Sequence, residues 1–198
     1  MAPRPEYCDR TRTGRIPAEP FVIPVGMVVM SQEATSLFGP LAQFGNDAPD
    51  YEKLREGTNR MVPFSAHVGI DITEIGPERA VAEIPAQDRM QNHMGSVHAG
   101  ALFLAADVAS GSAFVGAMAP RLSSVVRFVV RESRCTFLKP ALGRIRAIAT
   151  VDERVVSGVL GRDTAEKFDI DTKALCYDDN DVLVAKFSFD CVCKITED

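Results

Sequence analysis

An apolar run with almost no polar face spans residues 101–119. A helix that is apolar on all sides belongs in a protein core or in a membrane, and this run is nearly long enough to cross a bilayer. It is rich in Ala, Gly and Ser, however, and it carries Asp107 without a nearby basic residue. Because a carboxylate is costly inside a bilayer, we expect a buried core helix and no membrane span. Asp107 is then a candidate functional residue.

Alternating apolar and polar residues predict strands before and after this helix in the sequence. The last of them places Phe187, Phe189, Cys191 and Cys193 on one face. A short helix is predicted before the first strand, at residues 51–61, and Pro63 ends it. The predicted strands are residues 68–75, 80–84, 125–138, 145–151, 165–177 and 182–195.

One long apolar helix among six strands indicates an α+β domain in which a single antiparallel sheet wraps around the helix. We assign this domain to residues 51–198. Residues 1–50 mix arginines, acidic residues and prolines, a composition that resists packing, and we assign them to a partly irregular N-terminal extension.

The extension contains one apolar segment, residues 21–30. Pro24 and Gly26 interrupt it and acidic residues precede it, which argues against a signal peptide. The alternatives are a strand or strap lying on the domain, and a later start of translation at Met27 or Met30.

Composition narrows the class of protein. Hydrophobic residues make up 46% of the chain and charged residues 25%, as in globular proteins, and the net charge of −5 argues against nucleic-acid binding.

The five cysteines are odd in number, and Cys191 and Cys193 have neither the second pair nor the nearby His of a zinc site. We therefore expect core thiols, no metal and a reducing compartment, which we take to be the cytosol, with mitochondria as the alternative.

The start of the long helix is the second chemical candidate. Residues 92–100 form a polar loop that runs directly into the helix. Backbone N–H groups at a helix N-terminus are unpaired and can hold an oxyanion, and the small residues Ala99 and Gly100 let a ligand approach. Asp107 follows Gly100 by seven residues, so it lies about 10 Å further along the axis. A single carbonyl cannot touch both groups in one subunit, and a shared site therefore predicts an oligomer.

The spacing Asn92-x-x-Gly95-x-x-His98-x-Gly100, followed by Asp107 on an apolar helix, resembles the hotdog-fold acyl-CoA thioesterases. The closest likeness is to the phenylacetate-pathway and thioesterase-superfamily-member-2 branch. Residues 136–143 also resemble the strand and turn that follow the helix in that fold. The resemblance implies a hotdog fold over roughly residues 54–195.

The resemblance also implies roles for these residues. Asp107 would be the general base or the nucleophile, and Asn92 of the partner subunit would position water or the thioester. The N–H of Ala99 would polarise the thioester carbonyl, with Gly100 beside it. We place Gly95 and His98 in the substrate-binding loop, although a histidine here also serves as a helix cap.

Two departures from the family pattern stand out. Ala99 replaces the first glycine of the usual H-G-G, which keeps the N–H but narrows the approach. The family's helper Ser or Thr falls near Ser123, Ser124 or Val125, and a shift of one residue decides whether a hydroxyl is present there.

These observations predict an acyl-CoA thioesterase that needs no cofactor and forms a homodimer or homotetramer. The alternatives are a non-catalytic acyl-CoA-binding hotdog protein and a hotdog dehydratase or hydratase, whose catalytic His motif we do not find. Coenzyme A carries phosphates, which Arg and Lys suit. Basic residues that either bind those phosphates or are merely solvated are Arg121, Arg127, Arg131, Lys139 and Arg144.

Overall fold

The computed structural model describes residues 36–162 and 164–197. The predicted strap at residues 21–30 lies outside the described residues. The described part contains four α-helices, six strands and three 3-10 helices. In chain order they are η1 (Gly39–Phe44), α1 (Tyr51–Met61), α2 (Pro63–Val68), β1 (Asp71–Ile75), β2 (Ala80–Ile84), η2 (Asp88–Met90), α3 (Ala99–Ala117), η3 (Ala119–Ser124), β3 (Val125–Phe137), β4 (Ile145–Val151), α4 (Glu153–Leu160), β5 (Glu166–Tyr177) and β6 (Leu183–Ile195).

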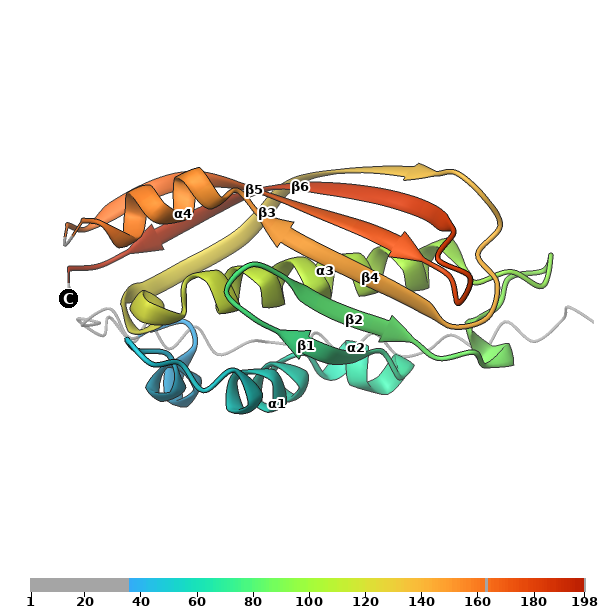
Figure 1. The fold of residues 1–198 in the computed structure, drawn as a ribbon, viewed down its shortest axis with the longest axis horizontal. Coiled ribbons are helices and arrows are strands. Elements are labelled where there is room, and N and C mark those ends of the chain that lie inside the picture. Colours follow the sequence, from blue (N-terminus) through green and yellow to red (C-terminus); the bar gives the residue numbers. More distant parts are fainter. Residues whose placement is uncertain (1–35, 163, 198) are drawn as a thin grey trace, which may run out of the picture. The chain divides into compact units, whose positions relative to one another are not determined.

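The strands form one antiparallel sheet in the order β1-β2-β4-β5-β6-β3. The sheet curves along α3, which lies against one of its faces (Figure 1). Among the described strands β3 pairs only with β6, over most of its 13 residues, and along its other edge the described residues add one backbone hydrogen bond, from the Leu37 N–H to the Val125 carbonyl. The α+β arrangement of a sheet around a central helix, predicted from the sequence, is confirmed.

α3 is the core helix of the domain. By length and composition it is apolar enough to cross a membrane, but 67% of its most apolar 18-residue window is buried inside the domain. Alanines on the side of α3 that meets the sheet, such as Ala105, Ala109 and Ala113, have no exposed surface. Small residues let the sheet approach closely, and at Gly116 a Cβ would overlap the Gly76 carbonyl oxygen in the β1–β2 turn.

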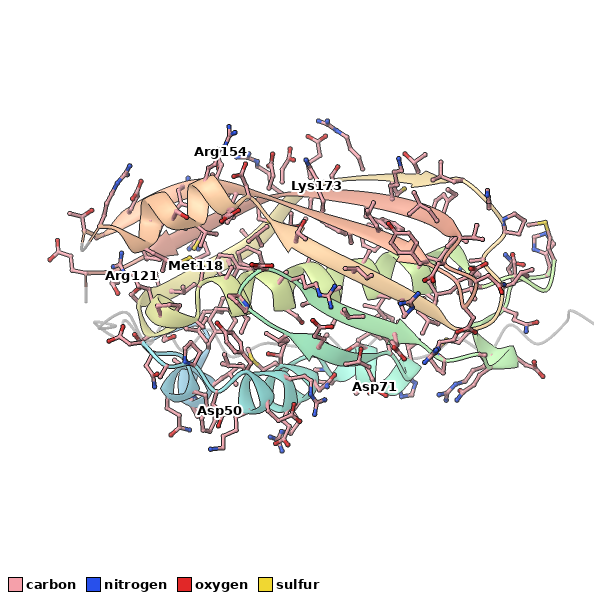
Figure 2. All side chains as sticks on the ribbon, in the orientation of Figure 1. Asp50, Asp71, Met118, Arg121, Arg154 and Lys173 are labelled. Atoms are coloured by element: carbon pink, nitrogen blue, oxygen red, sulfur yellow. The ribbon has the colours of Figure 1, made fainter. Side chains whose placement is uncertain are left out.

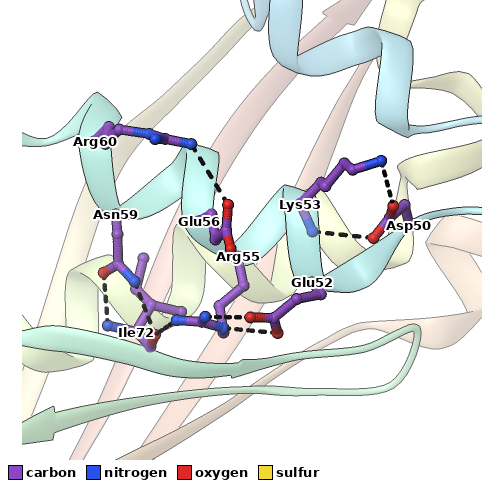
Figure 3. A network of polar contacts seen from close by, with 8 residues as sticks. All are labelled: Asp50, Glu52, Lys53, Arg55, Glu56, Asn59, Arg60 and Ile72. Carbon is purple, nitrogen blue, oxygen red and sulfur yellow. Dashed lines mark hydrogen bonds and ion pairs between the residues drawn. The ribbon is translucent and has the colours of Figure 1, made fainter.

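The predicted helix at residues 51–61 is confirmed as α1, which is fixed to the edge strand β1 (Figure 3). The Asn59 amide accepts a hydrogen bond from the Ile72 N–H at 2.8 Å and donates one to the Ile72 carbonyl at 2.9 Å. Arg55 donates to the same carbonyl while its guanidinium is paired with Glu52. One residue of β1 is thereby held by two side chains of α1.

The first strand is shorter than the alternation predicted. Residues 63–68 form the short helix α2, and β1 begins at Asp71 rather than at residue 68. Pro63 does end α1, but it also occupies the first turn of α2, where a missing N–H costs nothing. Gly69 then ends α2 with a positive φ of 89°.

Two further elements without a counterpart in the prediction, α4 and η1, add to the core. α4 follows β4 and is capped by Asp152, whose carboxylate accepts the N–H of Arg154 at 2.9 Å. η1 belongs to the stretch that the sequence assigned to the extension, and Phe38 and Leu41 are buried in the same core as α3. The described part of the predicted extension therefore packs on the domain.

A buried guanidinium holds α4 and the C-terminal segment together (Figure 2). Arg121 in η3 is 5% exposed, and it donates to the carbonyls of Val159, Arg162 and Thr196. Satisfying a buried cation with three carbonyls offsets its desolvation. Arg121 is thus a structural residue and no candidate for binding phosphate.

We predict that Gly116→Ala lowers the free energy of unfolding by about 1–3 kcal/mol, because the new methyl group overlaps the Gly76 carbonyl. Urea unfolding at pH 7 measures this as a lower midpoint with an unchanged slope. The matched control is Gly158→Ala in α4, where a Cβ meets nothing within 4 Å. It should stabilise by about 0.4–1 kcal/mol, and equal effects of the two changes would contradict this account of α3 packing.

Candidate active site

The loop before α3 is held by its own asparagine. The side-chain oxygen Oδ1 of Asn92 accepts the backbone N–H groups of Met94 and Ser96, and its side-chain nitrogen Nδ2 donates to the Ser96 hydroxyl at 2.9 Å. Gly95, between them, has a positive φ of 74° that favours glycine. Asn92 therefore shapes the loop in one chain, and only one N–H of its amide lacks a partner among the described residues.

His98 caps α3 and decides which backbone N–H groups remain open. Its Nδ1 accepts the Gly100 N–H at 2.9 Å, and its carbonyl accepts the N–H of Ala101. The N–H of Gly100, which the family resemblance places beside the oxyanion, is thus already hydrogen-bonded to His98. The Ala99 N–H makes no backbone hydrogen bond outside the helix in the described part of the chain, so it is the donor available to a ligand.

A hollow of about 380 Å³ opens at this end of the helix. It brings Asn92 and Ala99 together with the segment that follows β3, including Lys139. The open N–H of Ala99, the positive end of the helix dipole and one lysine therefore face the same space.

A separate cavity of about 300 Å³ lies beside Asp107. Its walls come from η1, the α1–α2 corner, α3 and the strands β3 and β6. Apart from Asp107 and a few hydroxyl and thiol groups, the lining is apolar and includes Phe38, Met61, Phe128 and Val130.

Asp107 is an isolated carboxylate. It is half-buried, and it makes no hydrogen bond or ion pair with any described residue. Burial without a cationic partner disfavours the charged form and raises the pKa of Asp107 above its ordinary value. A carboxyl group with a raised pKa in a cavity is suited to act as a general base near neutral pH.

The hydroxyl group nearest to Asp107 in the chain is one that the sequence did not single out. Ser110 lies one helical turn further along α3, lines the same cavity, is 3% exposed, and its Oγ has no hydrogen-bond partner. The expected helper positions do not line this cavity: Ser124 donates to the Arg121 carbonyl, and Val125 is fully buried. The sequence does contain one signal for Ser110: a residue three positions after Asp107 lies on the same face of a helix.

Cys191 also lines the Asp107 cavity. Burial raises the pKa of this thiol to about 11, and the Asp107 charge acts in the same direction. Burial likewise raises the pKa of Cys193 to about 12, so both residues are core thiols, as predicted, and not nucleophiles. Within the described ranges, no group of three or more His, Cys, Asp or Glu side chains could hold a metal ion.

Most of the basic candidates are engaged with acidic neighbours. Arg131 pairs with Asp169 and Arg144 with Asp179. Lys139, in the hollow at the helix start, and Arg127 form no ion pair in the part of the chain that the structure describes. Among the basic residues considered for binding phosphate, Lys139 and Arg127 therefore remain candidates.

The two halves of the candidate site are apart in one chain. Ala99 and Asp107 are eight residues apart on α3, or about 12 Å along its axis. The hollow at Ala99 and the cavity at Asp107 share no lining residue. One copy therefore has the Ala99 N–H donor in the hollow, without a base beside it. It has the Asp107 base in the cavity, without an oxyanion donor beside it.

Comparisons with known proteins identify a family and a fold. The family model described as "Domain of unknown function (DUF4442)" matches residues 52–192. The comparison with curated proteins gives no match.

Solved structures establish the fold. A "probable thioesterase" of Pseudomonas aeruginosa is 21% identical with a TM-score of 0.58, over 71% of this chain and 93% of that one. The PaaI protein of the Escherichia coli phenylacetic acid degradation operon is 21% identical with a TM-score of 0.53, over 72% and 91%. A protein of unknown function from Chlorobaculum tepidum is 19% identical with a TM-score of 0.61, over 73% and 96%. The hotdog fold implied by the sequence resemblance is confirmed.

We predict that Asp107→Asn stabilises the protein increasingly as pH rises from 4 to 7. The folded-state pKa of Asp107 is raised, so the wild type loses stability as pH rises through that pKa, whereas the neutral amide loses none. Urea unfolding of both proteins at several pH values measures the difference. The exposed Asp88→Asn is the control, and a difference that does not change with pH would show that burial leaves Asp107 unperturbed.

Proposed function

We propose that this chain, which belongs to the DUF4442 family and has the hotdog fold, hydrolyses acyl-CoA thioesters. The observation that carries the proposal is Asp107, an unpaired carboxylate with a raised pKa in an apolar cavity. The structures similar to this chain include one described as a probable thioesterase, which supports the same reaction class.

In this mechanism Asp107 takes a proton from water as the water oxygen attacks the thioester carbonyl carbon. The carbonyl oxygen becomes an oxyanion, held by the Ala99 N–H at the positive end of α3 of a second copy. The intermediate collapses, the carbon–sulfur bond breaks, and the CoA thiolate receives the proton from Asp107. The products are a free acid and CoA. Direct attack by the Asp107 carboxylate is the alternative: the carbon–sulfur bond breaks as CoA leaves, an acyl–Asp107 anhydride forms, and water then hydrolyses it. Single-turnover hydrolysis in ¹⁸O-water labels Asp107 only if the reaction passes through this anhydride and water attacks its Asp107 carbonyl carbon.

Two further side chains fit this scheme. The unpartnered Ser110 hydroxyl lies one turn from Asp107, where it supports the attacking water or the thioester. The remaining N–H of Asn92 and the loop containing Gly95 and His98 adjoin Ala99, so we assign to them the positioning of the thioester at the oxyanion end.

The second copy docks on β3. Among the described residues β3 is an edge strand of 13 residues that pairs with β6 alone, and it carries exposed apolar side chains along its length, with Val129 49%, Val130 43% and Phe137 50% exposed. Long exposed edges of this kind pair with other strands. An antiparallel pairing of two β3 strands makes the two α3 helices run in opposite directions, which brings Ala99 of each copy toward Asp107 of the other. We therefore infer a homodimer, alone or as half of a tetramer.

A non-catalytic acyl-CoA-binding protein is the second candidate. The observation that favours it is the lack of a hydroxyl from Ser123, Ser124 or Val125 in the Asp107 cavity. Such a protein would bind acyl-CoA and release no thiol, which the following assay separates from a thioesterase.

The main test is thiol release from short, medium, long and aryl acyl-CoAs. Asp107→Asn should lower kcat about 10²- to 10⁴-fold by removing the base. Ala99→Pro removes the proposed oxyanion donor at the first position of the helix, where Pro is tolerated, and it should lower kcat about 10²- to 10³-fold. Ala99→Gly, which keeps the N–H, is the matched control. Turnover that survives Asp107→Asn would overturn the mechanism, and no turnover with bound acyl-CoA would favour the binding protein.

The shared site gives an independent prediction. A refolded equal mixture of Asp107→Asn and Ala99→Pro chains should recover about a quarter of the wild-type activity, because half of the dimers are mixed and each of these has one intact site of two. Thiol release before and after joint refolding measures the recovery. A mixture as inactive as its two components would place both groups in the same subunit's site.

A further inference from the structure

Gly111 is the one glycine of α3 that neither packing nor backbone geometry requires. At Gly116 a Cβ would overlap the Gly76 carbonyl, and at Gly100 it would lie 3.1 Å from His98 Nδ1. At Gly111 a Cβ would meet nothing within 4 Å, and φ is not positive. Glycine inside a helix is destabilising relative to alanine, so stability alone favours a larger residue there.

The open space at Gly111 belongs to the Asp107 cavity. Gly111 lines that cavity and follows Asp107 by four residues, so both lie on one face of α3. The cavity continues along the helix to Val115, about 12 Å from Asp107. Phe38, just before η1, and Phe128 from β3 each stack on Phe114 of the same helix, and both line the cavity. The floor is therefore α3, and aromatic side chains form a wall.

A second observation indicates that this space holds a ligand. Ser110 lines the cavity, is only 3% exposed, and its hydroxyl lacks a hydrogen-bond partner. Buried polar groups are normally paired. The hydroxyls of Thr58 and Ser112, which also line the cavity, are satisfied by the carbonyls of Leu54 and Val108. The unpaired polar groups in the described lining are therefore Ser110 and Asp107, beside a mainly apolar space, as an acyl group ending in a thioester requires.

We propose that Gly111 sets the size of the acyl group that this site accepts, by leaving a space that a side chain would fill. The proposal rests on the proposed thioesterase function and names its substrate class. The cavity of about 300 Å³ holds about ten groups of water size at ~30 Å³ each. This volume matches an acyl chain of about eight to ten carbons, and longer chains would have to extend beyond the cavity.

The test is the profile of kcat/KM over straight-chain acyl-CoAs from two to sixteen carbons. The wild type should be most active near eight to ten carbons. Gly111→Leu adds a side chain of four carbons to the cavity, so it should move the optimum about four carbons shorter and lower kcat/KM for decanoyl-CoA about 100-fold, with a much smaller effect on butanoyl-CoA. Gly111→Ala, a smaller change, should shorten the profile less and raise Tm.

Gly158→Leu in α4 is the matched control, because a Cβ there also meets open space but the residue does not line the cavity. It should leave the profile unchanged. A profile that is the same in wild type and Gly111→Leu would overturn the role of Gly111 while thioesterase activity stands. A monomeric Gly111→Leu in light scattering would also overturn it, by showing that the glycine serves contact between copies.

Binding separates this inference from the proposed function. If no acyl-CoA is hydrolysed, calorimetric titration with decanoyl-CoA still tests the cavity: binding by the wild type that Gly111→Leu loses, with CoA itself bound equally by both, would support the size limit without catalysis. Equal binding of decanoyl-CoA by both proteins would overturn it. Should Gly111→Leu fail to fold, Gly111→Ala is read in the same two assays.

Discussion

The burial of α3 against the sheet is the constraint on which the rest of the domain depends. An apolar helix without a polar face is stable in water only when its surroundings cover it, since most helical stability in proteins comes from packing. Its alanines and Gly116 let the sheet come close enough to exclude water. The curvature of the sheet and the positions of β1 and α1 follow from the need to surround this one element.

The same packing produces the chemistry. α3 packs chiefly against the β1 side and the middle of the sheet, while the β3 side leaves a cavity beside the helix. Asp107 faces that cavity, where no cation compensates its charge and the raised pKa is a consequence of burial alone. In a core that closed evenly around the helix, a carboxylate would either be excluded or need a buried partner.

The sequence predicted the elements whose patterns are local and regular. Residues 51–61, 80–84 and 145–151 match α1, β2 and β4 to the residue. The pattern could not reveal α2, because six residues between two stronger signals carry too little periodicity. η1 packs against α1 and against η3, which lies far along the chain, and no local pattern contains the second of these contacts.

The candidate site shows the same division. The motif located the loop, the helix start and Asp107, and the comparisons leave those roles as proposals. It could not show that His98 engages the Gly100 N–H and leaves the Ala99 N–H, since that depends on the rotamer of one imidazole. Nor could it separate Ser110 from other small residues of the helix, because a buried hydroxyl without a partner is a property of the packed structure.

The distance between donor and base makes assembly part of the proposed chemistry. A rigid helix keeps Ala99 and Asp107 about 12 Å apart in one chain, so no rotamer change can bring them to one carbonyl. A two-fold partner solves this geometrically, because it supplies the same helix in the opposite direction. In the proposed dimer it would also cover exposed residues of β3 and exclude water from the Asp107 cavity, which would strengthen every electrostatic interaction there. An isolated chain would thus bind an acyl group at Asp107 without polarising its carbonyl, and the dimer is the smallest unit in which the proposed reaction can proceed.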